Sequence, residues 1–105
     1  MATLYVEEFS AIGEASNLTG PALSTAQAGK FPSLTGQTVS IGGGSVQSSA
    51  FNAATTLIRV HTDVICSVLI GSNPTALTTR NRMAANQTEY FGVRPGDKIA
   101  VISNS

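Results

Sequence analysis

The residue types best suited to chemistry are a histidine, an aspartate and the single cysteine, which lie close together at His61, Asp63 and Cys66. Such residues can bind zinc or form a Cys/His catalytic pair. A zinc site needs three or four protein ligands, and this chain has no second histidine or cysteine. In a strand over Val64–Ile70, alternation directs Cys66 into the core, where a free thiol packs as a small apolar group. We therefore expect no metal site and no catalytic pair here, and we expect His61 to face solvent.

Other patterns that could indicate an active site are weaker. The glycines of Gly42-Gly43-Gly44 follow a predicted strand, but no convincing helix begins after them to present its amides to a phosphate. The sequence has no Gly-x-Ser-x-Gly motif. The carboxylates show no spacing that favours a catalytic pair; they are Glu7, Glu8, Glu14, Asp63, Glu89 and Asp97. We expect no enzyme activity, no catalytic residues, no cofactor and no metal.

The composition points to a surface that lies against other molecules. Charged residues make up 11% of the chain, against roughly 25% in ordinary soluble domains. Interface cores are depleted in charge, so this surface suits a protein that packs against neighbours, although a weakly charged soluble domain has the same composition. The net charge is zero and the basic residues form no patch beyond Arg80-Asn81-Arg82. Binding to nucleic acid or to an anionic membrane is therefore not expected.

Length and cysteine content restrict the class of protein further. A chain of 105 residues is expected to form one domain with a thin core. One cysteine cannot form an intrachain disulfide, which excludes a disulfide-stapled secreted scaffold. The first residues lack the basic and apolar regions of a signal peptide, and no apolar run approaches the roughly 20 residues of a membrane helix. We expect the protein to be made in the cytoplasm.

Alternating apolar and polar residues predict a series of short strands, with Val39 and Ile41 sharing one face of theirs. Tyr90 and Phe91 are adjacent, so one should pack in the core and the other should face outwards. The outward ring could serve an interface or stack on a sugar, although packing against a neighbouring strand is the commoner role. The predicted strands lie at Leu4–Phe9, Gln37–Ile41, Ser45–Phe51, Thr55–His61, Val64–Ile70, Leu77–Met83, Thr88–Val93 and Lys98–Ser103.

Two pairs of these strands are predicted to form hairpins. Thr55–Ile70 contains two strands joined by the short polar connection His61-Thr62-Asp63. The strands Thr88–Val93 and Lys98–Ser103 flank Arg94-Pro95-Gly96-Asp97, where proline followed by glycine predicts a type II turn. Short strands at this spacing predict a sandwich or a barrel.

The region Ser10–Thr35 differs from the rest of the chain. It is rich in Ser, Thr, Ala, Gly and Pro, and its helix-forming stretch at 22–30 has no apolar face. We predict an extended arm or long loop that becomes ordered against a neighbouring subunit. The fold expected for residues 1–105 is all-β: a small antiparallel β-sandwich or jelly-roll-like barrel, with the arm at 10–35 and a β core at 37–103.

About half of the chain resembles small structural proteins of tailed bacteriophage virions. The likeness lies in the segments Cys66–Ala76, Met83–Val93 and Pro95–Ile102, and in the opening residues Met1–Val6. It contains no catalytic signature. The resemblance implies a structural role in the particle, as a decoration or cement protein that clamps neighbouring capsid subunits, and such proteins are commonly small oligomeric β-sandwiches or jelly rolls.

The implied partner is the major capsid protein or another virion protein, together with further copies of this chain as a dimer or trimer. The location would be the virion, after synthesis in the host cytoplasm. Two alternatives stay open: a tail, neck or fibre-attachment subunit, and a module that binds carbohydrate or the host surface.

Overall fold

The computed structural model describes residues 2–16, 23–29 and 32–104, and all regular elements in these residues are strands. The prediction of an all-β fold is confirmed. The strands are β1 (Thr3–Phe9), β2 (Ile12–Ser16), β3 (Leu23–Gly29), β4 (Thr35–Ser40), β5 (Val46–Gln47), β6 (Leu57–Thr62), β7 (Cys66–Gly71), β8 (Arg82–Met83), β9 (Thr88–Gly92) and β10 (Lys98–Ser103).

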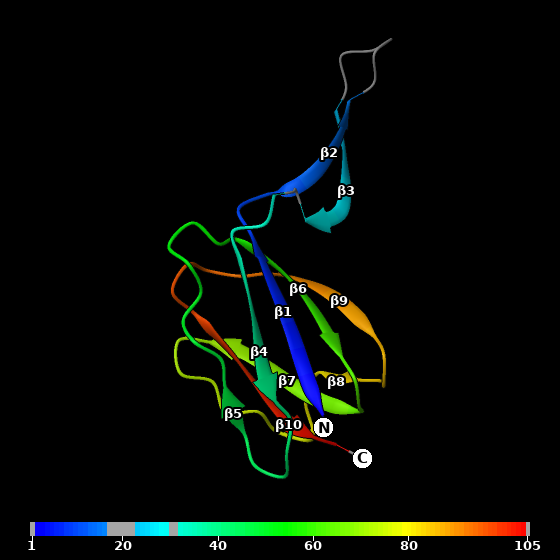
Figure 1. The fold of residues 1–105 in the computed structure, drawn as a ribbon, viewed down its shortest axis with the longest axis vertical. Coiled ribbons are helices and arrows are strands. Elements are labelled where there is room, and N and C mark those ends of the chain that lie inside the picture. The colour runs from blue at the N-terminus through cyan, green and yellow to red at the C-terminus, as the bar shows by residue number, and fades with distance from the viewer. Residues whose placement is uncertain (1, 17–22, 30–31, 105) are drawn as a thin grey trace.

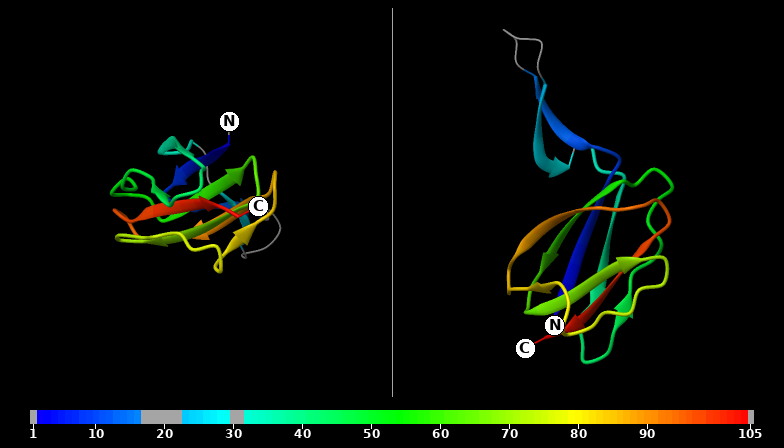
Figure 2. Two further views of the ribbon diagram at one scale, coloured as in Figure 1. Left: turned by 90° about the horizontal axis from the view of Figure 1, so that it is seen from below. Right: turned by 180° about the vertical axis from the view of Figure 1, so that it is seen from behind.

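Eight of these strands form two four-stranded antiparallel sheets that pack face to face as a sandwich (Figures 1 and 2). Sheet 1 has the order β4-β1-β6-β9, and sheet 2 has the order β5-β10-β7-β8. From β4 to β7 each successive strand changes sheet, and so does each from β8 to β10. The predicted small β-sandwich is therefore present, and most of its connections cross between the two layers.

The core lies between the sheets and follows the alternation in the sequence. Leu4 and Val6 of β1 point inwards from sheet 1, and Val68 and Val101 do so from sheet 2. Full burial of one such side chain contributes about 1.5–3 kcal/mol. Because β1 supplies these buried residues and lies between β4 and β6, the core also includes residues before the 37–103 range predicted for it. Val39 is buried and Ile41 packs against the same cluster, as their shared face predicted.

Both predicted hairpins are wrong, although the strands themselves are present. β6 pairs with β1 and β9 in sheet 1, whereas β7 pairs with β10 and β8 in sheet 2. The residues between β6 and β7 thus cross the end of the sandwich. β9 and β10 are also in different sheets, so the turn at Arg94–Asp97 joins the layers. That turn does form: Gly96 has φ 83°, and the Asp97 amide donates to the Arg94 carbonyl at 3.2 Å.

The remaining two strands form an arm outside the sandwich. β2 pairs antiparallel with β3 as a separate two-stranded ribbon, which follows β1 and precedes β4 in the chain and projects beyond the end of sheet 1 (Figure 1). The register shifts between Ile12 and Glu14, as at a β-bulge. The arm raises the radius of gyration to 14.7 Å, against about 13 Å for a compact chain of this length.

The arm region was predicted as an extended arm or loop, without strands. Its sequence lacks the alternation that marks a half-buried strand, so its two strands were not predicted. Residues 17–22 and 30–31 of the predicted arm lie outside the described part of the chain.

The outer face of sheet 2 is covered by the connection 72–81 (Figure 2). The Asn104 side-chain amide donates to both Ser67 Oγ and the Thr78 carbonyl, each at 2.8 Å. Gln47 Nε2 similarly donates to the Pro74 carbonyl at 2.8 Å. Ser67 and Ala100 alternate with core residues and so face outwards from sheet 2, yet both are 0% exposed. This sheet is therefore packed on both of its faces.

Candidate functional site

The chemical residues singled out from the sequence do not come together. Cys66 lies on the inner face of β7, fully buried, with its thiol against Thr62 Oγ1 at 3.4 Å. His61 faces outwards from β6, where its Nδ1 lies 2.8 Å from Thr88 Oγ1. Asp63 follows in the connection between the sheets. Within residues 2–16, 23–29 and 32–104, no three His, Cys, Asp or Glu side chains are placed to hold a metal ion.

Burial gives the Cys66 thiol a distinct electrostatic environment. Desolvation raises the pKa of Cys66, because the thiolate would lose its hydration, and the hydrogen bond with Thr62 partly opposes that rise. A thiol with a raised pKa stays protonated at neutral pH and is a weak nucleophile. The chemistry available to Cys66 is therefore packing, as its place in the strand pattern predicted.

The remaining sequence motifs also take structural positions. Gly42-Gly43-Gly44 is exposed, and the short strand β5 follows it. Phe91 packs against the core, while Tyr90 pairs with Arg59 on the outer face of sheet 1, which confirms that the two rings point opposite ways.

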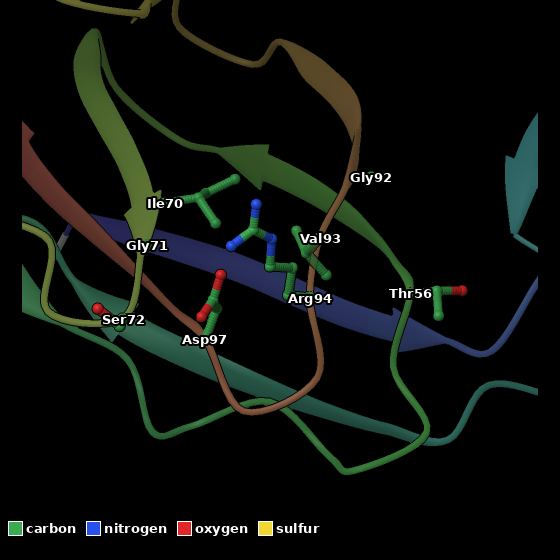
Figure 3. Close-up of a pocket in the computed structure, with 8 residues that line it drawn as sticks. All are labelled: Thr56, Ile70, Gly71, Ser72, Gly92, Val93, Arg94 and Asp97. Atoms are coloured by element: carbon green, nitrogen blue, oxygen red, sulfur yellow. The ribbon is translucent and has the colours of Figure 1, made fainter.

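An open hollow of about 620 Å³ lies where the end of β9 and the end of β7 meet the turn between the sheets (Figure 3). Arg94 and Asp97, both from that turn, point into it, beside the apolar side chains of Ile70 and Val93. The hydroxyl of Thr56, at its far side, donates to the Ser10 carbonyl at 2.7 Å. The hollow thus offers one cation and one anion on a single turn, with the hydroxyl residues Ser72 and Thr56 also in its lining.

The outer face of sheet 1 presents an exposed aromatic side chain. Tyr5 is 46% exposed, and its ring centroid lies 6.4 Å from that of His61 on the next strand. Arg59 and Tyr90 continue this outer face across β6 and β9. Aromatic and arginine side chains are enriched in protein interfaces. Tyr5 is exposed, whereas Arg59, His61 and Tyr90 are half-buried, so this face is open around Tyr5.

The arm leaves the sandwich from a rigid base. Glu7 Oε2 accepts a hydrogen bond from Ser33 Oγ at 2.7 Å, and the Leu34 amide donates to the Glu8 carbonyl at 2.7 Å. A side chain at Gly36 would bring its Cβ within 2.6 Å of Glu7 Oε1, so glycine leaves room for the Glu7 carboxylate. On the other root of the arm, Thr56 bonds the Ser10 carbonyl.

A buried carboxylate stabilises the same region from inside. Glu8 is 1% exposed, and its Oε1 accepts from the Asn52 amide at 2.7 Å and from Thr55 Oγ1 at 2.8 Å. Its Oε2 accepts from Gln37 Nε2 at 3.1 Å. The network joins β1, β4 and the connection before β6, so it supports the end of sheet 1 from which the arm projects. Nothing in the spacing of the carboxylates marked Glu8 as different from Glu7.

Comparisons with protein-family models, with curated proteins and with solved structures find no match to this chain. The described residues contain no helix long and apolar enough to cross a membrane. Three features of sheet 1 and its surroundings could serve binding: the open outer face around Tyr5, the edge strand β4 and the projecting β2/β3 arm. Sequence reasoning anticipated the arm, but not Tyr5 or the edge.

Proposed function

We propose that this chain is a structural protein of a tailed-phage virion, which decorates the assembled head and stabilises it by binding the major capsid protein. The observation that carries the proposal is the arm. The β2/β3 ribbon is a separate two-stranded sheet that projects away from the end of the sandwich at which β1 ends and β4 begins (Figure 1). A two-stranded hairpin is marginally stable in water by itself, so a ribbon that extends beyond its own core is best explained by a partner that covers it.

The composition and the two sheets support the same proposal. A low-charge ribbon with open strand edges can add to a partner through main-chain hydrogen bonds. The bare face of sheet 1 supplies an adjoining surface of Tyr5, His61 and Arg59. A decoration protein binds many equivalent places on a shell, so a modest contact for each copy is sufficient when copies are linked. The resemblance to small virion proteins adds to this support.

Co-sedimentation of the purified chain with empty phage heads tests the proposal. The wild-type chain is expected to bind saturably, at a fixed ratio to the major capsid protein. A variant in which residues 10–33 are replaced by an Asn-Gly turn should fold, because the register of β1 and β4 places Phe9 opposite Leu34 and a two-residue Asn-Gly loop suits a hairpin. It should no longer bind heads.

A matched control changes an exposed apolar residue on the covered side of the molecule. Leu77 is 48% exposed in the connection over sheet 2, and Leu77→Ser should bind heads as the wild type does. Thermal unfolding followed by circular dichroism checks that each variant is folded. Full head binding by the folded arm-less variant would refute the role given to the arm. If the wild-type chain binds tails or necks and does not bind heads, the protein would be assigned to those parts of the virion.

A second candidate function is carbohydrate or host-surface binding, which the exposed Tyr5 ring beside His61 favours. Exposed aromatic rings can stack on sugar faces. A glycan array compares the wild type with Tyr5→Ala. Specific glycan binding that Tyr5→Ala abolishes, without binding to heads, would support this candidate over decoration.

A further inference from the structure

The four sheet edges of the sandwich differ in length and charge. In sheet 2 the edge strands β5 and β8 have two residues each, too short to accept a long partner strand. In sheet 1 the edge strand β9 has five residues and includes Glu89, whereas β4 has six residues, Thr35–Ser40. β4 contains no charged residue and no proline. Charge, proline and short length are the usual means by which proteins prevent pairing at a sheet edge, and β4 has none of them.

The register shows which backbone groups of β4 point outwards. The Ile41 amide donates to the Ala2 carbonyl at 3.1 Å, so the alternate residues of the strand bond to β1. The amides and carbonyls of Gly36, Thr38 and Ser40 therefore point away from β1. In the described part of the chain these outward amides and carbonyls have no hydrogen bond. The connection that follows β4 bonds to the strand through the Gln37 side chain, which contacts the Ser49 amide and carbonyl.

We propose that a second copy of this chain pairs with β4, antiparallel, about a two-fold axis at Thr38. In that register Thr38 lies opposite Thr38 of the other copy, and Gly36 lies opposite Ser40. Each of these three pairs closes two backbone hydrogen bonds, so every outward amide and carbonyl of the three residues obtains a partner. The two copies of sheet 1 then form one continuous sheet, and the interface is isologous.

Properties of the edge favour a second copy over a foreign peptide. The set Gly36, Thr38 and Ser40 is self-complementary in an antiparallel register, and no like charges meet across the axis. Facing threonines are a favourable cross-strand pair. Two exposed apolar side chains also border the edge: Tyr5, the partner of Thr38 on β1, is 46% exposed, and Leu34, just before β4, is 38% exposed. A neighbouring copy would cover part of both. The inference does not depend on the proposed virion role.

Sedimentation equilibrium of the full chain over a range of concentrations tests the proposal. A monomer–dimer equilibrium is expected for the wild type. Thr38→Lys places like charges opposite each other across the axis, and it should raise the dimer dissociation constant at least about tenfold. Thr38 is exposed, so the fold should survive. The matched control is Thr88→Lys on β9, another exposed position at an edge of sheet 1, which should leave the dimer unchanged.

Amide hydrogen exchange of the wild type provides a measurement that needs no variant. The amides of Gly36, Thr38 and Ser40 should become protected as the concentration rises through the dissociation constant. A chain that stays monomeric, a trimer, or equal weakening by Thr38→Lys and Thr88→Lys would each overturn the proposal. Unchanged exchange at Thr38 in a proven dimer would also do so, because the contact would then lie elsewhere.

Discussion

The outer faces of the two sheets differ in how much of each is covered by other parts of the chain. Sheet 2 is covered by the connection 72–81, so Ser67 and Ala100 are fully buried although they point away from the core. Sheet 1 leaves Tyr5 46% exposed in the middle of its outer face. The edge strands of the two sheets also differ in length. Those of sheet 2 have two residues each, whereas β4 of sheet 1 has six.

This difference shows which side of the molecule its own connections leave open. A chain this small can cover one sheet with its own loop, and it does so for sheet 2. The arm, the bare face and the uncharged edge all belong to sheet 1 or extend it. We therefore expect substitutions on sheet 2 to change the stability of the fold, and substitutions on the outside of sheet 1 to change association.

The largest expected effect comes from placing a charge on each outer face. Ala100→Asp puts a carboxylate into the buried layer beneath the connection 72–81, and it should lower the unfolding free energy by about 3 kcal/mol or more. Tyr5→Asp on sheet 1 should lower it by less than about 1 kcal/mol, since that side chain is half exposed. Urea unfolding measures both. Similar values for the two variants would contradict the assignment of one covered and one bare face.

A smaller difference in stability is expected between substitutions on the inner and the outer face of β1. Glu8→Gln replaces one acceptor oxygen by an amide that cannot accept from both Gln37 and the Asn52–Thr55 pair, so it should cost about 1–3 kcal/mol. Glu7→Gln keeps an acceptor for Ser33 and should change stability by less than about 0.5 kcal/mol. The two variants are compared by urea unfolding at neutral pH. Equal losses would mean that the buried network contributes nothing beyond the exposed contact.

The smallest effect concerns the inner face of sheet 2 at high pH. Burial raises the pKa of Cys66, so the thiol ionises at lower pH in the unfolded chain than in the folded chain. Its contribution to stability is present below the ordinary thiol pKa and is lost as the pH rises through the folded value. The unfolding free energy should therefore decline as the pH rises above the ordinary thiol pKa, and Cys66→Ser should show a weaker decline.

The same variant separates packing from binding. Cys66→Ser should lower stability at neutral pH through poorer packing, while self-association and partner binding stay intact, because Cys66 is buried in the core and contributes nothing to the exposed surface. A folded Cys66→Ser protein that fails to bind would contradict the structural role of this residue.

The sequence predicted most strands of the sandwich but not how they pair. Alternation placed the strands around Leu4–Phe9, Gln37–Ile41 and Lys98–Ser103, since each has one face on the core. The same alternation is compatible with two neighbouring strands in one sheet or in opposite sheets. For β6 and β7, and for β9 and β10, only contacts distant in sequence decide the matter, and they place the strands in opposite sheets.

The candidate interaction surface was less predictable for a similar reason. A strand that reads as polar outside and apolar inside gives no sign of whether a loop will cover its outer side. Ser67 and Thr38 are both small hydroxyl residues facing outwards, yet Ser67 is buried and Thr38 is exposed. The arm carried one usable signal, a long stretch without an apolar face, which identified its place but not its two strands.

The continuity of the arm with sheet 1 also has a mechanical consequence. A pull on the arm draws β1 and β4 in the same direction, so it loads the pairing of β1 with β6, whose ladder hydrogen bonds lie perpendicular to the strands. Such a load shears many bonds at the same time instead of opening them one after another. Because β4 is pulled together with β1, the resistance within the sheet comes from β6 on the other side of β1. A tether built in this way would transmit tension to the whole of sheet 1 before any single strand could peel away.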